Sequence, residues 1–329
     1  MTQTSVFSFI RGLILACISV GTALVAHGQT VYPTRNIQLI NPFPPGGTSD
    51  IIARSFAHEL GAELGQTVYV DNKAGAGGTV GAEFVSRAVP DGYTLLLSNS
   101  SMLAVSPLLY TQARFNVEKD LSPVVVLVQG ANVLLVNTEL PVKSLAELVA
   151  FAKAKPGTLN FGSTGGGTTT HLAGEMLKQM TGTQIQHVPY RGAGPAMTAL
   201  LAGDVQMMFD NIPSAIQQIR SGKVRPIAVT GPSRVDALPS VPTMQEAGLP
   251  RFEVTGWFSL SAPEKTPKDV IARLNAAAQK VLQSAEFQKR IAELGYQTVG
   301  GSPEKMAEMT RAEVARWTPI VKASGAKIE

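Results

Sequence analysis

The chain has 329 residues and a formal net charge of +4, and hydrophobic residues make up 44% and charged residues 16% of it. This composition predicts a packed globular protein of one large or two modest domains, and it excludes a disordered chain. The basic residues are scattered rather than gathered in a stripe, which gives nucleic-acid binding little support. A mildly cationic surface does suit a protein that collects anions.

The N-terminus has the pattern of an export signal. Arg11 precedes an apolar run over residues 12–26, and residues 26–28 place small side chains at the two positions that a signal peptidase reads. The run is shorter than the roughly 20 residues that a membrane-spanning helix needs. We therefore expect residues 1–28 to be a cleaved signal peptide and the mature protein to lie in the periplasm, although the exact cleavage site stays open.

The single cysteine, Cys17, lies inside this segment. The mature chain then has no disulfide, no cysteine nucleophile and no cysteine-based metal site. Residues 15–17 also resemble the end of a lipoprotein processing box, so a lipid anchor on Cys17 stays open as an alternative. The spacing from Arg11 is short for that reading.

Strand-like and helix-like segments alternate along the mature chain, which predicts an α/β fold. The expected strands are residues 36–41, 67–70, 93–98, 124–128, 133–136, 159–162, 185–188, 205–209 and 227–229. The expected helices are residues 48–64, 80–88, 144–153, 171–180, 196–202, 267–284, 286–294 and a final one from Ser302. Residues 48–50, Ser144 and Thr266 are expected to cap their helices. On the first helix, Ile52, Phe56, Leu60 and Leu64 are spaced to lie on one face.

Two extended segments, residues 123–130 and 224–231, lie far apart in the chain and could be paired crossover strands. In that case the chain folds as two lobes. Residues 29–126 together with 229–329 form a discontinuous first lobe, and residues 127–228 form the second.

Glycine-rich loops lie where expected strands lead into helices. Residues 42–48 (PFPPGGT) and 73–79 (KAGAGGT) are the first two. Glycine lets a ligand approach the backbone, and a helix N-terminus presents N–H groups that favour an anion. Residues 163–170 and 190–194 form a third and a fourth loop, the third rich in hydroxyls. A plain turn or capping loop without a ligand is the alternative for each.

Other chemistries find little support. The third position of a G-x-G-x-x-G spacing falls on Val80, and no P-loop or G-x-S-x-G motif is present, so we expect no nucleotide cofactor and no serine hydrolase. His58, His171 and His187 have no metal-ligand spacing, so we expect no metal, and we interpret His171 as structural.

Asp210 caps the next helix or binds a ligand, and the pattern leaves both open. Residues 207–208 and 257–258 are interpreted as core. A secreted hydrolase or isomerase that uses Asp210 or His171 remains a rival hypothesis.

Several motifs together resemble the Bug family, the substrate-binding proteins of tripartite tricarboxylate transporters. They are residues 42–48, 74–78 with 90–93, 160–165 with 171–175, 187–192, 238–243, 246–250 and 262–263. The resemblance covers essentially the whole mature chain. It implies a two-lobed, type II periplasmic-binding fold with two crossover strands and a closing cleft.

The resemblance also implies a site that holds a ligand carboxylate by main-chain groups of the first two loops. The residues that we expect to bind the ligand are Phe43, Pro45, Gly46, Gly47, Thr48, Ala76, Gly78, Ser98, Ser163, Thr164, Thr168, Tyr190 and Asp210. The expected function is capture of a mono-, di- or tricarboxylate, aromatic acids included, by a monomer that delivers it to membrane permease subunits. A ligand sensor that signals to a membrane kinase is the alternative. The chain is not expected to be an enzyme, and the identity of the acid stays open.

Overall fold

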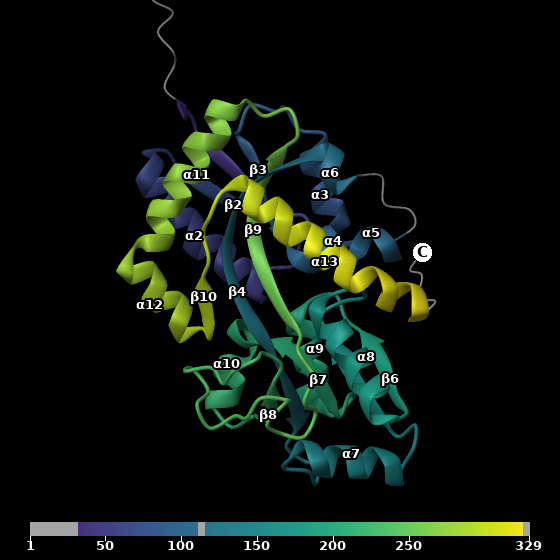
Figure 1. Ribbon diagram of the computed structural model, residues 1–329. Helices are drawn as coiled ribbons and strands as arrows, with labels where there is room; N and C mark the ends of the chain where they lie inside the picture. Colours follow the sequence, from purple (N-terminus) through teal and green to yellow (C-terminus); the bar gives the residue numbers. More distant parts are fainter. Residues whose placement is uncertain (1–31, 111–115, 325–329) are drawn as a thin grey trace, which may run out of the picture. The chain divides into compact units, whose positions relative to one another are not determined.

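The structure is a computed structural model that describes residues 32–110 and 116–324 (Figure 1). The expected signal peptide, with Cys17, lies outside the described residues. The chain from Arg35 onward forms one compact unit. Among the described residues, no helix combines the length and the apolar character that crossing a membrane requires.

A first group of strands is built around parallel neighbours. β1 (Ile37–Asn41) pairs in parallel with β2 (Val68–Asn72) on one side and β3 (Thr94–Asn99) on the other. The antiparallel β9 (Thr255–Pro263) joins β3 to β4 (Leu121–Asn137), and β10 (Tyr296–Thr298) also pairs with β4. The strand order here is β2-β1-β3-β9-β4.

A second group of strands is built on the later half of the same strand, β4. The later half of β4 pairs antiparallel with β7 (Met207–Asn211) and β8 (Val224–Val229). β5 (Leu159–Ser163) lies parallel to β7 and to β6 (Ile185–Pro189). β4 therefore runs from the first group of strands into the second, with β9 alongside its first half (Figure 1).

The two strands expected at residues 124–128 and 133–136 are one continuous strand, so that prediction was wrong. The break was placed at the polar and glycine residues between them. Gly130 lies inside β4 and pairs with Gly256 on one side and Tyr296 on the other. A Cβ at Gly130 would overlap the Tyr296 ring, so this glycine permits a close approach rather than a turn.

Residues 224–231 and the first half of β4, which could have been paired strands, do not pair with each other. Within β4, β8 pairs with the later half, and the first half pairs with β9, which sequence patterns did not reveal. The chain between them still packs on the second group, because Phe252 and Val254 join the core cluster that contains Phe161 and Phe209. The return to the first group thus takes place at β9, and the lobe boundaries themselves stay a prediction.

Most helices match the expectation. Their bounds are α2 Thr48–Leu64, α3 Thr79–Ser86, α7 Leu145–Ala154, α8 Thr169–Thr181, α9 Ala193–Ala202, α11 Lys268–Gln283, α12 Ala285–Glu293 and α13 Pro303–Ser324. The helix expected after Asp210, whose bounds the sequence did not define, is α10 (Ile212–Arg220). The sequence patterns missed the single-turn η1 (Ala76–Gly78) and three short helices, α4 (Ser100–Ala104), α5 (Ser106–Leu109) and α6 (Val117–Asp120).

Two cap predictions were wrong. α2 begins after Gly47 without a side-chain cap, and the Asp50 carboxylate accepts the N–H of Gly46 at 3.1 Å instead. α11 begins after Pro267, and the Thr266 hydroxyl donates back to the carbonyl of Pro263 at 2.7 Å. In both cases a capping residue type stands near the helix start but bonds to the preceding loop.

The described core lies between the sheet and these helices. On α2 the apolar stripe of Ile52, Phe56, Leu60 and Leu64 is buried as its spacing predicts. Each such side chain contributes about 1.5–3 kcal/mol when it leaves water. The packing fixes each helix start against the carboxyl end of the strand before it. α2 follows β1, α4 follows β3, α9 follows β6 and α10 follows β7. β5 leads into the loop before α8.

Candidate functional site

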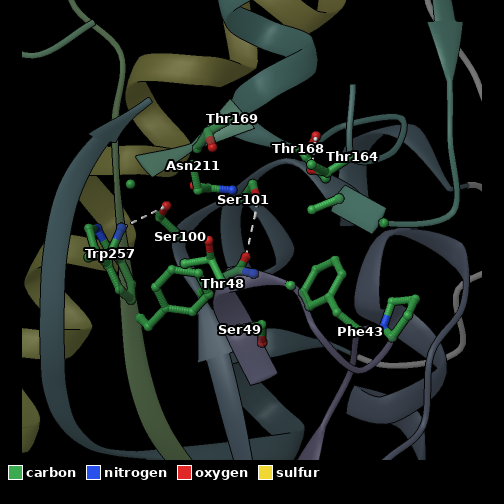
Figure 2. Close-up of a pocket in the computed structure, with 17 residues that line it drawn as sticks. Phe43, Thr48, Ser49, Ser100, Ser101, Thr164, Thr168, Thr169, Asn211 and Trp257 are labelled. Atoms are coloured by element: carbon green, nitrogen blue, oxygen red, sulfur yellow. Dashed lines mark hydrogen bonds between the residues drawn. The ribbon is translucent and has the colours of Figure 1, made fainter. Parts of the chain in front are cut away.

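A small cavity of about 50 Å³ lies where these helices begin, and we call it the anchor pocket (Figure 2). Its wall consists of residues 43–44, 47–49, 99–101, 164, 168–169, 192–193, 211 and 256–258. Thr48, Ser100, Ser101 and Asn211 surround the same space in Figure 2, with Phe43 and Trp257 on opposite sides of it. The starts of α2, α4, α8 and α9 all contribute to this wall.

Two of these helix starts have no side-chain cap. α2 follows Gly47 and α9 follows Gly192, and a glycine N-cap has no side chain that could accept a hydrogen bond from its helix. The first-turn N–H groups of a helix have no intrahelical acceptor, and each helix dipole favours an anion by about 0.3–1 kcal/mol. The anchor pocket therefore suits a negatively charged oxygen group.

The polar side chains of the pocket are held by their neighbours. The Asn99 side chain accepts from the N–H of Met102 at 2.8 Å and from the Ser101 hydroxyl at 3.1 Å. The Ser100 hydroxyl accepts the N–H of Trp257 at 3.4 Å. Among the described residues that line the pocket, none is Asp or Glu. A bound carboxylate would thus meet hydroxyls and amides without a like charge in the wall.

Asp50, in the first turn of α2, is ionised, and its charge is balanced by the nearby Arg54. Burial alone would raise the pKa of Asp50, but hydrogen bonds from Arg54, Gly46 and Asn72 outweigh it and hold this pKa below its ordinary value. The carboxylate accepts hydrogen bonds from the Arg54 side chain at 3.0 Å and from the Asn72 side chain at 3.1 Å. It therefore stabilises the glycine loop and does not line the pocket.

A second cavity of about 930 Å³, here called the outer cavity, adjoins the anchor pocket. The two share Phe43, Pro44, Thr164 and Gly192. The rest of the outer wall consists of residues 74–78, 110, 165–166, 171, 187 and 189–191. On the same measure about 10–15 Å³ holds one water molecule, so the anchor pocket has room for a small group such as a carboxylate. The outer cavity offers the larger space beside it.

Two stacked imidazoles form part of the outer wall. The rings of His171 and His187 lie 4.0 Å apart between centroids, and Phe161 stacks on His187 at 4.7 Å. Burial, with smaller contributions from His171 and Lys178, lowers the pKa of His187 to about 3. Burial also lowers the pKa of His171. Both rings are therefore neutral at neutral pH.

Asp210 is fully buried at the end of β7 and lines neither cavity. Its Oδ1 accepts hydrogen bonds from the N–H of Asn211 at 2.8 Å and from the hydroxyl of Ser214 at 2.9 Å, and its Oδ2 has no hydrogen-bond partner among the described residues. Burial raises the pKa of Asp210 to about 7. Of the two roles left open for this residue, the structure shows the contact with the start of α10.

The other expected site residues fall into four sets, of which the first two overlap. Phe43, Gly47, Thr48, Thr164 and Thr168 line the anchor pocket, and Phe43, Thr164, Ala76, Gly78 and Tyr190 line the outer cavity. Pro45 and Gly46 are exposed and line neither cavity. Ser98 and Ser163 are buried beneath the wall. The second glycine loop thus lies in the outer cavity rather than beside the first loop in the anchor pocket.

The two buried serines have partners that explain their placement. The Ser98 hydroxyl lies 2.6 Å from that of Ser259 and 2.8 Å from that of Ser261, both on the neighbouring strand β9. The Ser163 hydroxyl lies 2.7 Å from Nε2 of His187. These residues support the wall from behind.

Sequence reasoning missed several lining residues. Residues 99–101 follow a strand with a run of Asn and Ser, the same kind of signal as in the other loops. Trp257 and Phe258 were interpreted as core, and they are buried but also line the anchor pocket. They lie on β9, which no local pattern revealed, so no signal could have found them.

Among the described residues, no group of three or more His, Asp or Glu is arranged to hold a metal ion.

The chain is similar along its whole length to proteins of one family. Residues 52–326 match the tripartite tricarboxylate transporter family receptor, TctC. Protein BugT of Bordetella pertussis is 38% identical over 330 residues, which cover all of both chains.

Two solved structures from Rhodopseudomonas palustris resemble this one closely. Rpa4515 with adipate has a TM-score of 0.88 and 36% identity, and the match covers 90% of this chain and 100% of that one. MatC with bound malate has a TM-score of 0.83 and 32% identity, over 88% of this chain and 100% of that one.

These matches confirm the predicted fold class, a two-lobed α/β periplasmic-binding-protein fold of type II. They also confirm the resemblance on which the expected function depended. This chain belongs to the TctC, or Bug, family of tripartite tricarboxylate transporter receptors, which are solute-binding proteins and not enzymes.

Proposed function

We propose that this protein is a periplasmic receptor that captures a small organic carboxylate and delivers it to the membrane permease of a tripartite tricarboxylate transporter. The observation that carries this proposal is the convergence of helix starts, two of them uncapped, on the anchor pocket. Residues 1–28 would direct its export and then be removed, and the receptor would act as a monomer.

In this proposal the ligand carboxylate lies in the anchor pocket and accepts hydrogen bonds from the first amides of α2 and from the neighbouring hydroxyls. Each charge-assisted hydrogen bond contributes about 1.5–3 kcal/mol. Phe43, Gly47, Thr48, Thr164 and Thr168 surround the carboxylate, while Ala76, Gly78 and Tyr190 face the body of the ligand. The adipate and malate bound by two relatives agree with an acid of this size.

A thermal-shift screen of the mature protein tests the capture of carboxylates. Organic acids are compared with their neutral amides and with cationic solutes of the same length. A ligand at 100 times its Kd should raise the free energy of unfolding by about 2.7 kcal/mol. We expect acids, and not their amides, to raise the melting temperature. The proposal fails if neutral or cationic solutes shift it while no carboxylate does.

Gly47→Val tests the location of the carboxylate. Gly47 has a φ of −85° and thus accepts a side chain without backbone strain. Its Cβ would lie 3.8 Å from that of Ala193, so the two methyl groups of valine would fill the space between them. We expect the loss of acid binding with little change in the melting temperature of the ligand-free protein.

Gly194→Val is the matched control, because a Cβ there meets nothing within 4 Å and Gly194 lines neither cavity. Equal affinity in both variants would place the carboxylate elsewhere.

Uptake by cells tests the permease partner. Deletion of the gene should abolish high-affinity uptake of the acid that the screen identifies, and the plasmid-borne gene should restore it. Unchanged uptake, together with a lost transcriptional response to the acid, would favour the sensor.

A further inference from the structure

The described residues that line the outer cavity offer hydrogen-bond donors and one arginine, Arg191. No Asp or Glu is among these described lining residues. Arg191 is exposed and forms no ion pair or hydrogen bond with its side chain to any described residue. Guanidinium groups recognise carboxylates through paired N–H donors. Arg191 is therefore available to a ligand group that extends away from the anchor pocket.

His171 adds a second donor to the same wall. Its Nδ1 accepts the N–H of Gly167 at 3.1 Å, so the proton of the neutral ring lies on Nε2. The Glu175 carboxylate lies 3.9 Å from Nε2, which is too far for a hydrogen bond, and Lys178 binds that carboxylate at 2.9 Å. The Nε2–H group thus has no hydrogen-bond acceptor among the described residues, and His171 lines the outer cavity.

The neighbouring cation, Lys73, does not compete for this role. Its ammonium group lies 3.1 Å from the Asp71 carboxylate and 4.4 Å from the centre of the Phe84 ring. Lys73 itself does not line the outer cavity, although the loop that follows it does. Of these two described cations, Arg191 is therefore the one that lines the outer cavity.

Resting on the proposed function, we infer that Arg191 and His171 are the specificity-determining residues of the outer cavity and receive a second carboxylate of the ligand. The first carboxylate then occupies the anchor pocket, and the chain between the two crosses the region that both cavities share. The stack of Phe161 and His187 behind His171 fixes the orientation of its ring.

This arrangement discriminates by chemistry as well as by size. A monocarboxylate would leave Arg191 and the Nε2–H of His171 without a ligand partner. An amino acid that reaches the same point with an ammonium group would face Arg191 with no carboxylate in the wall to balance it. Specificity for a di-acid therefore includes a repulsive component against cationic ends.

Isothermal titration calorimetry with matched ligands tests the inference. The panel consists of straight-chain dicarboxylates from succinate to sebacate, malate and terephthalate. Each is compared with its monoamide. Each straight-chain dicarboxylate is also compared with the monocarboxylate of equal length and with the ω-amino acid of equal length, in which an ammonium group replaces the second carboxylate. We expect at least one dicarboxylate to bind about tenfold or more tightly than its monoamide, as one charge-assisted hydrogen bond predicts, and the amino acid to bind most weakly.

Arg191→Gln removes the charge and keeps hydrogen-bonding capacity. We expect it to weaken binding of the preferred dicarboxylate by about tenfold or more and to leave the matched monocarboxylate unchanged. Arg251→Gln, an exposed arginine outside both cavities, is the control and should change neither affinity.

Two substitutions of His171 separate the donor from the ring's structural contact. His171→Gln places an amide N–H near the position of Nε2, whereas His171→Asn keeps an acceptor near Nδ1 for Gly167 and loses the distal donor. We expect the Asn variant to lose dicarboxylate affinity and the Gln variant to retain more of it. A structural role alone would reverse this order, because only Asn preserves the bond from Gly167.

The outcomes separate this inference from the proposed function. If acids bind but the ratio of dicarboxylate to monocarboxylate affinity is the same in the wild type, Arg191→Gln and His171→Asn, the inference is overturned while carboxylate capture stands. If no acid of the panel binds to the wild type, the proposed function fails and the inference with it. Tight binding of the amino acids would contradict the expected repulsion between Arg191 and a cationic ligand end.

Discussion

Asp210 shows how one buried side chain acquires properties that its residue type does not predict. One oxygen accepts two hydrogen bonds at the start of α10, and the other has no hydrogen-bond partner among the described residues. The charged form of such a group is destabilised by burial, which raises the pKa of Asp210 from 3.8 to about 7. Part of the stability of the folded protein therefore depends on a proton at this site.

The pH dependence of stability tests this reading of Asp210. Between pH 3.8 and about 7 the folded chain keeps a proton on Asp210 that the unfolded chain releases, so this group loses stability as the pH rises. Asp210→Asn is neutral throughout. The free energy of unfolding of the wild type should fall relative to that variant by a few kcal/mol across this range, about 1.4 kcal/mol per pH unit at most, and no further above it.

Urea unfolding at a series of pH values measures this difference. Asp236→Asn, at an exposed position, serves as the control and should show no such trend. A difference between the wild type and Asp210→Asn that is the same at every pH would show that Asp210 is ionised in the folded protein.

Residue patterns predicted the glycine loops but not the environment of each residue in them. Gly47 and Thr48 line the anchor pocket, whereas Pro45 and Gly46, from the same loop, are exposed and do not line it. Ser98 and Ser163 carry the right hydroxyl chemistry and are turned into the structure. Local sequence shows which loop approaches a ligand, and the turn geometry then decides which side chains reach it.

At the scale of elements, α2 and α10 are joined by a hydrogen-bonded chain. The Thr48 hydroxyl at the start of α2 accepts the N–H of Ser214 at 3.1 Å and lies 3.0 Å from the Ser214 hydroxyl, which in turn donates to Asp210. α2 follows a strand of the first group, and α10 follows a strand of the second. The start of α2, and with it one wall of the anchor pocket, is thus fixed to the second group of strands.

A double-mutant cycle of Thr48→Val and Ser214→Ala tests this link. Thr48→Val leaves the N–H of Ser214 unpaired and should cost about 1–3 kcal/mol of stability. Because the two residues share their hydrogen bonds, we expect an interaction energy of about 0.5–3 kcal/mol in urea unfolding. Effects that add within about 0.5 kcal/mol would show that the contact does not connect the two helices energetically.

Elements with strong periodicity were predictable, and elements defined by partners were not. The stripe on α2 and the Ser144 cap of α7, which accepts the N–H of Glu147, follow from local spacing. β9 and the joining of two expected strands into β4 depend on pairing between distant segments, and the glycine at the junction is explained only by Tyr296. A local pattern contains no information about such a partner.

For the whole molecule, the parallel strands account for the position of the site. Their carboxyl ends lead into helices whose first turns converge on the anchor pocket, and ligands of open α/β sheets bind at such ends. The fold class and the family were predictable from the combination of loops. The division of the cavity into a small anchor and a large outer part was not, because it depends on how the two groups of strands approach each other.

A crystal structure of the protein with its highest-affinity acid tests the central claim most directly. We predict a carboxylate in the anchor pocket, within hydrogen-bonding distance of the backbone N–H groups at the start of α2 and of the hydroxyls beside Trp257, with the body of the ligand in the outer cavity. A ligand that places an apolar end in the anchor pocket, or a carboxylate bound only in the outer cavity, would contradict the account.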